Sequence, residues 1–536
     1  MKIAVCFKVV PRWERVLPND WNQFTPDQDI AYAGREFNCF DQSALELALR
    51  LKEARGNKEP PIRCAAVTVG RRPSAPFIQT LFAVGFDEVT VLEEEKAEFA
   101  PRSVAHLLAS YIKEGRFDLV LAGSVAGMAD SGTVPFWLAQ FLDWPVFTEV
   151  QELECGEQGI AAIRQDRSGR WRYLLRPPLL LTVGNSFAVL RAPTLKARLA
   201  AGKKSPRFPV LPKKEPQDSA ATLGFERAWA ERSCRMLPGS DAEELALLLF
   251  REKLLQIRRE QSGRTSPERY LSSAEKIISY EPQPAEGPIA HSAFWQLEKD
   301  WRERRPDLAL LPHTPEGRLL ATALAARTGA ALFTEAKLLG RDKGKLIVQK
   351  RACAGNIYWR AALPLPVILT LHPLPEGVPR VPLMSPTVEQ PRWLVEATRL
   401  EKPAETDLQN RPLTVICGLG ISSAGACLQA RRLAQKLGAG FGLTRPAALE
   451  SWGKVDEIIG GSGMALSSKT CLVLGASGAG AFMAGLEGVK NIIAVNTDEE
   501  ALIFKQADVG LLTDAPKLVE AMLGHLQKNN NLRNDR

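Results

Sequence analysis

Histidine is scarce in this chain, which limits the chemistry that the chain can support. The 536 residues include five histidines, none at the spacing of a metal-binding motif, so we expect no metal centre. Nine cysteines are scattered singly without a C-x-x-C pair, and several lie in apolar segments. We therefore expect buried, reduced thiols rather than disulfides or zinc ligands.

Long apolar runs are also missing. No run approaches the ~18 residues that suggest a membrane-spanning helix, and the start, Met1 to Cys6, is a short strand without the apolar core of a signal peptide. We expect a cytoplasmic protein with no membrane insertion. The net charge of +8 is small for this length, and the basic residues gather between Lys196 and Arg269 without interleaved aromatics, so nucleic acid is not an expected partner.

The chain is long enough for roughly three or four domains, and its hydrophobic content of 45% is ordinary for globular proteins. Strand and helix patterns alternate over residues 1–200, which predicts βαβ units and a doubly wound parallel sheet. The predicted strands are 3–7, 64–69, 88–92 and 118–121, and the predicted helices are 41–53, 75–84 and 103–114. We expect Asp41 to cap the first of these helices.

Three glycine-rich loops follow one another near the C-terminus, within Val455–Asp514. The segments 470–474 and 491–495 are predicted buried strands, and each ends in Gly, Ser or Asn. A helix is predicted after Gly480, so its free N–H groups would suit an anionic pyrophosphate. Glycines at strand ends are also common in tight connections, but three such loops in succession favour a dinucleotide site.

This region resembles the FAD domain of the electron transfer flavoprotein alpha subunit. The resemblance covers about the last ~120 residues in matching order and spacing. The motifs that carry it are Gly418-Leu-Gly420, Thr444-Arg445-Pro446, Ile459-Gly-Gly-Ser-Gly463, Gly475-Ala-Ser-Gly-Ala479, Val495-Asn-Thr-Asp498 and 501–508. It implies an α/β fold with a Rossmann-like FAD-binding domain, with FAD held by Gly418, Gly420, Thr444, Arg445, Gly460, Ser462, Gly463, Gly475, Ser477, Gly478, Ala479, Asn496, Asp498 and Asp514.

The resemblance also implies roles for single residues. It places Arg445 beside the isoalloxazine, Ser462 within reach of flavin N5, Ser477 at the pyrophosphate, and Asn496 and Asp514 near the ribose and adenine. The chain departs from the family at Leu419, which replaces Arg, at Gly461, which replaces Gln, and at Ala481-Phe482, which replaces Gln-His. Weaker stabilisation of negative charge at the N1–O2 edge of the flavin is expected.

A further Gly- and Ser-rich loop, Gly123–Pro135, leaves a predicted strand and enters a predicted helix. Its backbone N–H groups could cradle a phosphate, or Asp130 or Ser131 could simply cap the helix; on the residues alone the two interpretations are equal.

Residues 1–205 are similar to the electron transfer flavoprotein beta subunit. The matching motifs are Lys8-Val-Val-Pro11, Asn38-Cys-Phe-Asp41, Ala44-Leu-Glu46, Ala83-Val-Gly85, Phe117–Leu121 and Ala126–Val134. The resemblance implies adenine nucleotide alpha hydrolase-like sheets and a second nucleotide, AMP or a second FAD, held by Cys6, Lys8, Asn38, Asp41, Gly70, Gly123, Asp130, Ser131, Gly132, Thr133 and Val134. Met128 stands where the family usually has an acidic residue.

The segment Leu190–Leu199 is a basic helix start with Leu195 at its centre. Alone it suggests a solvated linker, but in the family this position is the docking loop for acyl-CoA dehydrogenases, so Leu195 is a candidate docking residue.

Proline and lysine are dense over 203–240, which predicts an extended linker between two fused subunits. A Leu-rich helix is predicted over 241–260, a strand over 276–280 and a helix over 290–304. Resemblance to the first domain of the alpha subunit resumes at 306–318, 325–329 and 350–356, and the Pro-rich stretch 373–391 predicts a hinge. The expected organisation is a beta-like domain 1–205, a linker 206–240, an alpha N-terminal-like domain 241–372, a hinge 373–410 and an FAD domain 411–536.

The resemblance implies a carrier that moves electrons on FAD from flavin dehydrogenases of fatty acid β-oxidation to a quinone oxidoreductase or iron–sulfur acceptor, without a catalytic residue or turnover of its own. One alternative is a degenerate adenine-nucleotide scaffold that has lost flavin. An NAD-dependent dehydrogenase is a second alternative, but Ser423 stands where the third glycine of the Rossmann motif should be.

Overall fold

The computed structural model describes residues 1–17, 19–56, 61–94, 98–156, 159–166, 169–184, 186, 188–210, 220–228, 232–255, 276–282, 291–372, 374–375, 377–383, 391–402, 408, 411–461 and 463–534. The chain forms two compact units. Unit 1 contains Met1–Glu226, Arg264–Cys353 and Tyr358–Pro403, and unit 2 contains Arg227–Gly263, Ala354–Ile357 and Ala404–Arg536.

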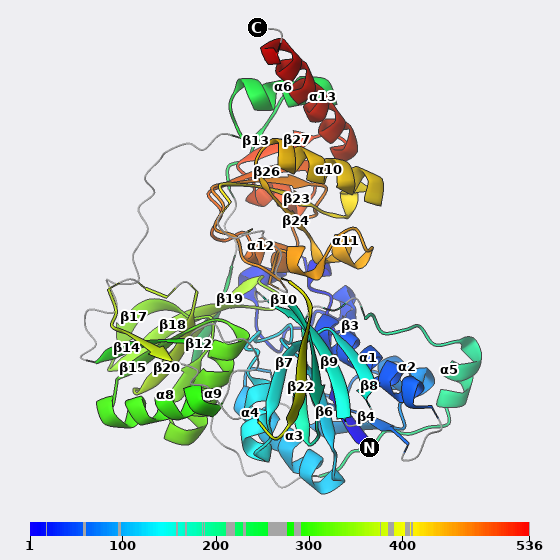
Figure 1. Ribbon diagram of the computed structural model, residues 1–536, viewed down its shortest axis with the longest axis vertical. Coiled ribbons are helices and arrows are strands. Elements are labelled where there is room, and N and C mark those ends of the chain that lie inside the picture. The colour runs from blue at the N-terminus through cyan, green and yellow to red at the C-terminus, as the bar shows by residue number, and fades with distance from the viewer. Residues whose placement is uncertain are drawn as a thin grey trace. The chain divides into compact units, whose positions relative to one another are not determined.

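Unit 1 begins with the predicted doubly wound sheet, in which all strands are parallel and the order is β5-β4-β1-β6-β11-β7 (Figure 1). Its strands are β1 (Lys2–Cys6), β4 (Arg63–Gly70), β5 (Glu88–Glu93), β6 (Leu119–Gly123), β7 (Val146–Val150) and β11 (Leu179–Val183). Its helices are α1 (Cys39–Arg55), α2 (Ala75–Val84), α3 (Pro101–Gly115), α4 (Val134–Leu142) and α5 (Leu195–Ala201). Short elements precede α1: β2 (Val9–Pro11), β3 (Arg35–Phe37), η1 (Trp13–Arg15), η2 (Asp20–Gln23) and η3 (Ala31–Ala33).

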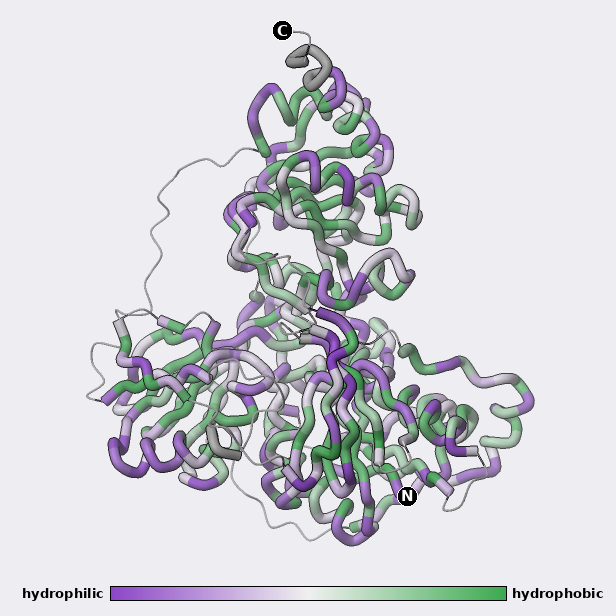
Figure 2. Tube along the Cα trace, in the orientation of Figure 1, coloured by the Kyte–Doolittle hydropathy of each residue, from purple (hydrophilic) through white to green (hydrophobic). Residues whose placement is uncertain are grey.

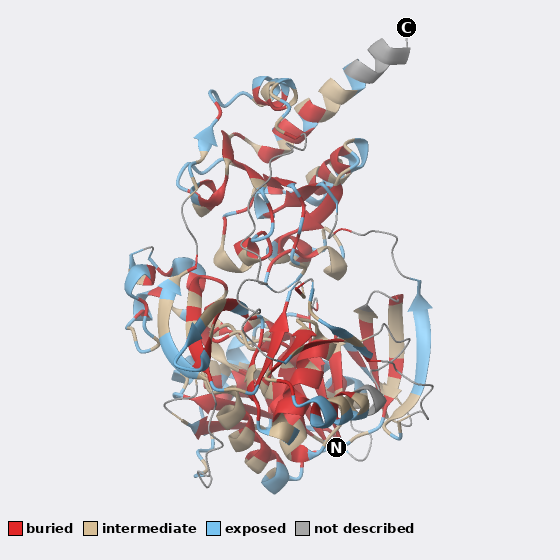
Figure 3. Cartoon of the chain, turned by 90° about the vertical axis from the view of Figure 1, so that its left-hand side faces the viewer, coloured by how far each residue is buried: buried red, intermediate tan, exposed pale blue. Residues whose placement is uncertain are grey.

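Both faces of this sheet are buried, as alternate residues of β1 show. Ile3 and Val5 pack in one cluster with α1 and α2, whereas Ala4 packs in another with α3 and α4. The strands are accordingly rich in hydrophobic residues on both faces, a pattern typical of parallel sheets, and most of these residues are buried (Figures 2 and 3).

An antiparallel sheet of order β22-β10-β9-β8 also belongs to unit 1. It consists of β8 (Glu152–Gly156), β9 (Gly159–Asp166), β10 (Gly169–Leu175) and β22 (Leu394–Glu401).

The later part of unit 1 contains a second parallel sheet, β16-β20-β15-β14-β21, and a smaller sheet, β12-β19-β18-β17. The strands are β12 (Ala221–Arg227), β14 (Ile277–Pro282), β15 (Leu308–Pro312), β16 (Ala331–Phe333), β17 (Lys337–Asp342), β18 (Lys345–Ala352), β19 (Ile357–Leu363), β20 (Val367–Leu371) and β21 (Arg380–Leu383), with helices α8 (His291–Arg304) and α9 (Pro315–Thr328). α9 packs on α4, and Leu138 and Leu324 share one hydrophobic core. The two predicted domains therefore join through buried apolar surface.

Unit 2 is a third parallel sheet, of order β13-β27-β26-β25-β23-β24. Its strands are β13 (Arg235–Met236), β23 (Leu413–Cys417), β24 (Gly440–Leu443), β25 (Thr470–Leu474), β26 (Asn491–Asn496) and β27 (Val509–Leu512). The helices are α6 (Ala242–Arg251), α10 (Ala424–Lys436), α11 (Arg445–Leu449), α12 (Gly480–Ala484) and α13 (Ala515–Asn534), with η4 (Leu419–Ile421), η5 (Val455–Glu457) and η6 (Leu502–Gln506). The predicted α/β class with doubly wound parallel sheets is confirmed.

The stretch 206–240, predicted as a linker, contains ordered pairings. Arg207 exchanges two backbone hydrogen bonds with β5, to Val89 and Val91. β12 is the edge strand of its sheet, and β13 adds to the edge of the sheet in unit 2. α6, predicted as part of the domain 241–372, instead packs on α13 in unit 2. Asp241 caps α6 by accepting bonds from the amides of Glu243 and Glu244, and residues 256–260 of the predicted helix lie outside the described residues.

The predicted hinge 373–410 also contains two strands. β21 pairs with β14, and its Pro382 is tolerated because β21 is an edge strand. β22 pairs with β10, more than two hundred residues earlier in the chain. Residues 373, 376, 384–390, 403–407 and 409–410 lie outside the described residues, so the hinge prediction can be compared only with its remaining residues.

The predicted cap of α1 is wrong, and the alternative of a cap at the start of α4 is excluded. α1 begins at Cys39 after Asn38, and Asp41 lies inside its first turn. α4 begins after Thr133, without a side-chain cap, so neither Asp130 nor Ser131 caps it. The nine cysteines form no disulfide, and five of them are buried while four are half-buried. Among the described residues, no helix has the length and apolarity needed to cross a membrane.

The packing of α6 on α13 predicts unequal effects of two leucine substitutions on one helix. Leu245 is fully buried and Leu247 is half exposed. Leu245→Ala should lower the free energy of unfolding by about 2–4 kcal/mol through lost burial and a cavity, whereas Leu247→Ala should cost under about 1 kcal/mol. Denaturant unfolding of the full chain measures both. Equal effects would mean that α6 does not pack in this core.

Candidate functional site

The predicted FAD residues of unit 2 gather at one edge of its parallel sheet. Because the strands share one direction, their carboxyl ends meet, and loops there face a common region. Gly418 follows β23, Thr444 and Arg445 follow β24, Gly475 follows β25, Asn496 ends β26, and Thr513-Asp514 follow β27. This is the edge at which doubly wound sheets bind nucleotides.

The glycines at this edge are required by contacts between the loops themselves. A Cβ on Gly418 would lie 2.4 Å from the carbonyl oxygen of Gly475, and one on Gly420 would lie 2.7 Å from the Gly475 Cα. Gly478, with φ +86°, would meet the backbone nitrogen of Ile503 at 2.4 Å. The interpretation of these glycines as tight connections is therefore correct, and it is compatible with a nucleotide lying above the loops.

The segment around Gly460 joins the same edge through backbone bonds. The amide of Ile459 donates to Leu443 (2.9 Å) and that of Gly461 donates to Ala481 (2.6 Å), so Gly460 and Gly463 lie in a loop between β24 and α12. Ser462 lies outside the described residues, and the prediction that its hydroxyl reaches flavin N5 stays a prediction.

Three polar residues at this edge bond locally. Asn496 Nδ2 donates to the carbonyl of Ala476 (3.0 Å), and its Oδ1 accepts from the amide of Asp498 (3.0 Å). Asp498 accepts from Glu500, and Asp514 accepts from the amide of Lys517 in the first turn of α13. These side chains shape the loops, and their contacts with a ribose or adenine stay predictions.

Arg445 is the first residue of α11 and is half-buried, after a buried Thr444. Ala479 immediately precedes α12, while Ser477 is exposed. Ser423, which stands where a Rossmann motif would have its third glycine, caps α10 by accepting from the amide of Ala426 (3.2 Å). That position is therefore used to start a helix.

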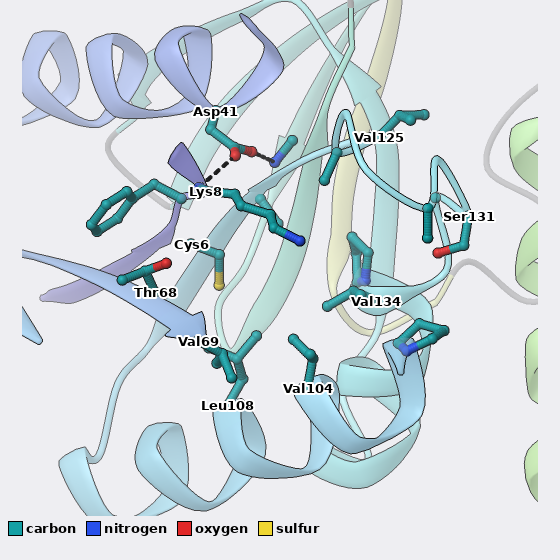
Figure 4. Close-up of a pocket in the computed structure, with 18 of the residues that line it drawn as sticks. Cys6, Lys8, Asp41, Thr68, Val69, Val104, Leu108, Val125, Ser131 and Val134 are labelled. Carbon is teal, nitrogen blue, oxygen red and sulfur yellow. Dashed lines mark hydrogen bonds between the residues drawn. The ribbon is translucent and has the colours of Figure 1, made fainter. Parts of the chain in front are cut away.

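A pocket in unit 1 collects most of the residues predicted for the second nucleotide. It encloses about 770 Å³ of space, a volume that includes the part open to solvent. Figure 4 shows Cys6, Lys8, Asp41 and Ser131 around it, with Val104 and Leu108 of α3 forming one wall. Of the predicted residues, Cys6, Lys8, Asp41, Gly123, Asp130, Ser131, Gly132 and Val134 line it.

The other three predicted residues lie outside its lining. Asn38 donates from Nδ2 to the carbonyl of Val125 (2.9 Å) and so holds the loop between β6 and α4. Gly70 ends β4, next to the lining residue Val69. Thr133 lines a neighbouring cavity instead.

Asp41 joins three elements beneath the pocket. Its Oδ2 accepts from the amide of Lys8 (2.8 Å) and its Oδ1 from the amide of Gly123 (3.1 Å), so one carboxyl ties α1 to the ends of β1 and β6 (Figure 4). Burial raises the pKa of Asp41 to about 7, against the opposing effect of these bonds, and burial also raises the pKa of Cys6 to about 12. Cys6 is therefore a protonated thiol.

The charge at the pocket mouth is balanced. Lys8 Nζ pairs with Glu98 at 2.9 Å, and both side chains are about three-quarters buried. Glu98 was not predicted from the sequence, because it belongs to no motif and reaches Lys8 from 90 residues away.

The loop between β6 and α4 is held by residues from the later part of unit 1, one after β16 and two in or just after β18. The amide of Cys353 donates to the carbonyl of Met128 (2.7 Å), Lys350 Nζ to that of Asp130 (2.7 Å), and Thr334 Oγ1 to that of Ser131 (2.9 Å). No hydrogen bond between described residues uses the amides of Ser131, Gly132 or Thr133. These N–H groups are therefore available to an anion.

Gly132 has φ +58°, and the buried guanidinium of Arg318 lies against it. A Cβ on residue 132 would lie 2.0 Å from NH1 of Arg318, so only glycine leaves room for this guanidinium. Asp130 also adopts a left-handed conformation, with φ +48°. Successive turns of this kind curl a backbone into an anion-binding concavity. Arg318 and Lys350 lie in segments that resemble the alpha subunit, but neither they nor Thr334 were predicted to contact this loop, because they lie about two hundred residues from it.

The geometry defines a protein of doubly wound parallel sheets, in which loops gather at the carboxyl edge of the sheet of unit 2 and a pocket opens among the strand ends of unit 1. Residues 30–207 match the model described as "Electron transfer flavoprotein domain", and residues 407–487 match that described as "Electron transfer flavoprotein FAD-binding domain". The chain belongs to the electron transfer flavoprotein family, and its C-terminal domain is an FAD-binding domain.

Similar proteins cover this chain in part. "Protein FixB" of Salmonella typhimurium is 30% identical over 229 residues, which is 41% of this chain and 73% of FixB. "Putative electron transfer flavoprotein subunit YgcQ" of Escherichia coli K12 is 29% identical over 262 residues, 46% of this chain and 86% of that protein. The subunit YdiR of the same organism, named in the same way, is 27% identical over 327 residues, 58% of this chain and 96% of that protein.

The raised pKa of Asp41 predicts a pH dependence of stability. Between about pH 4 and pH 7 the folded protein binds a proton at Asp41 that the unfolded chain does not, so the free energy of unfolding falls as the pH rises through this window. Between pH 5 and pH 7.5 the fall should be roughly 2 kcal/mol larger in the wild type than in Asp41→Asn, which cannot titrate. Urea unfolding at both pH values measures it. Equal falls would show that the amide bonds outweigh burial and keep the carboxyl ionised.

Proposed function

We propose that this protein accepts electrons on FAD from flavin dehydrogenases, such as the acyl-CoA dehydrogenases of fatty acid β-oxidation, and passes them to a quinone oxidoreductase or an iron–sulfur acceptor. The observation that supports it most is the gathering of the predicted FAD residues at the carboxyl edge of one parallel sheet, inside the segment that matches an FAD-binding domain. When bound, FAD supplies reversible uptake of electrons, and the protein supplies its position and the field around it.

In this proposal the chain itself has no catalytic residue. The backbone of 475–480 and Ser477 hold the pyrophosphate at the start of α12, Asn496 and Asp514 lie near the ribose and adenine, and Arg445 lies beside the flavin ring. The position of Arg445, half-buried at the end of β24, supports this role. A cation there stabilises negative charge on the ring.

The pocket of unit 1 holds a second nucleotide, AMP or a second FAD. The amides of Ser131 and Gly132, which are available, support a phosphate position there. A neighbouring cavity shares Ser131 with the pocket and has walls from Phe99, Trp137 and Trp359. Extraction of the bound nucleotides from the purified chain and mass spectrometry would identify them.

The chain represents beta-like and alpha-like parts fused in one polypeptide, with the beta-like part first. The order of the two matched segments supports this. Fusion replaces an encounter between subunits by a tether with a high effective concentration.

A degenerate scaffold without flavin is the second candidate. It is favoured by the departures at Leu419, Gly461 and Ala481-Phe482, and by the local bonds that already occupy Asn496 and Asp498. The visible absorbance of the purified protein separates the two candidates, since only a flavoprotein is yellow.

Arg445→Ala should lower the reduction potential of the flavin, because it removes a cation beside the ring. A loss of about 1–2 kcal/mol corresponds to a shift on the order of 30 mV for a two-electron couple. Spectroelectrochemical titration measures it, with Arg432→Ala, an exposed arginine of α10, as the control of equal charge change. Equal potentials in the wild type and Arg445→Ala would place Arg445 away from the flavin.

Leu195→Ala should slow reduction by an acyl-CoA dehydrogenase at low dehydrogenase concentration and leave reduction by dithionite unchanged. An anchor residue of this kind typically contributes about 2 kcal/mol, so the expected loss is on the order of thirtyfold. Stopped-flow absorbance measures both rates. Leu17→Ala removes another exposed leucine of unit 1 and should leave both at the wild-type value.

A further inference from the structure

Two of the nine cysteines meet in the core of unit 2. Cys417 is the last residue of β23, and Cys427 lies near the start of α10, which packs on that strand. Both belong to one hydrophobic cluster and are buried, at 0% and 1% exposure. Their thiols are hydrogen-bonded to each other, so the two sulfur atoms are already neighbours in the reduced protein.

The chain between the two cysteines is short and held by local bonds. Gly418 and the turn η4 follow Cys417, and Ser423 then caps α10 by accepting from the amide of Ala426. The carbonyl of Ser423 also accepts from the amide of Cys427 (3.0 Å), which fixes Cys427 in the first turns of the helix. The contact between the thiols therefore follows from a single strand–turn–helix connection.

The surroundings make the two thiols unequal. The hydrogen bond donated by Cys417 lowers the pKa of Cys427, and the positive charge of Arg431 acts in the same direction, against burial and Glu457. The same hydrogen bond, together with burial, raises the pKa of Cys417. Arg431 lies one turn after Cys427 and donates from NH1 and from NH2 (2.8 Å) to Glu457. Because the thiolate is the reactive form of cysteine, Cys427 is the nucleophile of the pair and Cys417 stays protonated.

The cover over Cys427 is a short surface connection. Its Sγ donates to the carbonyl of Trp452 (3.7 Å), within residues 450–454, which join α11 to η5. Ser451 and Lys454 of this connection are exposed, and Trp452 is half-buried. Displacing these few residues opens a path to the thiol without opening the sheet, and local openings of this kind need less free energy than global unfolding.

We propose that Cys417 and Cys427 are a redox pair that hydrogen peroxide converts into a disulfide. The Cys427 thiolate attacks one peroxide oxygen, so that an S–O bond forms and the O–O bond breaks, and the hydroxide that leaves takes up a proton to become water. The sulfur of Cys417 then attacks the sulfur of this sulfenic acid, which forms the S–S bond and breaks the S–O bond. The second hydroxide takes the proton of Cys417. The two thiols lose two electrons in total, and one peroxide is reduced to two molecules of water.

The disulfide would anchor a tightly packed loop. Gly418 follows Cys417 directly, and a Cβ on Gly418 would lie 2.4 Å from the carbonyl oxygen of Gly475. A bond from the end of β23 to α10 closes the loop that contains η4 and so restricts its opening. The inference does not depend on the proposed function, because it concerns only thiols and backbone of unit 2.

Peroxide treatment of the full chain, followed by alkylation with N-ethylmaleimide in denaturant and tryptic mass spectrometry, tests the pair. No Lys or Arg lies between Cys417 and Cys427, so trypsin leaves both in one peptide, and Cys471 falls in another. The peptide with the pair should be lighter by two hydrogens and carry no maleimide, and dithiothreitol should restore alkylation of both thiols.

Cys471 is the matched control within the same sheet. It is fully buried in β25, and burial raises its pKa to about 12. The pair should be oxidised roughly tenfold faster than Cys471, or more. Full alkylation of Cys417 and Cys427 after peroxide, or oxidation of Cys471 at the same rate, would overturn the proposal.

Serine variants assign the two roles. In Cys417→Ser no disulfide can form, so the sulfenic acid of Cys427 should accumulate and be captured by dimedone. In Cys427→Ser, Cys417 should stay unlabelled. Capture at Cys417 alone, or at neither residue, would refute Cys427 as the nucleophile. The peptide analysis of the wild type decides the existence of the pair even if a variant folds poorly.

Hydrogen exchange tests the anchoring of the loop. The amides of residues 418–423 should exchange severalfold more slowly in the oxidised wild type than in the reduced wild type, because the cross-link restricts local opening. Peroxide-treated Cys417→Ser should show no such slowing. Equal exchange in the two wild-type forms, with the disulfide present, would contradict the anchoring.

Discussion

The common direction of the strands is the constraint on which the rest of this structure depends. In each of the three parallel sheets the carboxyl ends meet at one edge, so loops that are far apart in sequence are brought into backbone contact there. Such contacts leave no room for side chains, and Gly418, Gly420 and Gly475 satisfy them. The same arrangement leaves backbone amides at the edge without partners in the sheet, which is why phosphate groups bind there. The common strand direction therefore explains both the glycines in the loops and the ability of this edge to bind phosphate.

The pocket of unit 1 depends on residues after β16 and in or after β18 that do not line it. The carbonyls of Met128, Asp130 and Ser131 are all engaged by residues between Thr334 and Cys353. Engaging three carbonyls on one side of a loop restricts the rotation of its peptide planes, so the direction of the remaining amides is fixed. Lys350 is only 2% exposed, and a buried ammonium without its carbonyl and glutamate partners would be costly. The loop and the residues that bond to its carbonyls therefore depend on each other for their positions.

Helices and strands with a regular hydrophobic pattern could be predicted from the sequence. Contacts between residues far apart in the chain could not. α2 begins and ends where its pattern indicated, because Pro76 in the first turn and Gly85 after the last are local signals. Asp41 lines the pocket but was wrongly taken as a cap, since its partners lie in other segments: Lys8 just after β1, and Gly123 at the end of β6. β22 was taken as part of a hinge because nothing in its own residues identifies β10 as its partner. Lys350 supports the loop from 220 residues away, a distance that no motif spans.

The pairing of β22 with β10 has a practical consequence for truncated forms of the protein. β22 is the outer strand of its sheet, and six of its eight residues are exposed, including Glu396, Arg399 and Glu401. Charged outer strands discourage a second molecule from adding to a sheet. β10, beneath it, contains Trp171, Tyr173 and Leu175, and its edge would be bare in any fragment that ends before Leu394. Such a fragment would keep the first parallel sheet and yet be prone to self-association, so residues 394–401 belong with the N-terminal half when the protein is divided for expression.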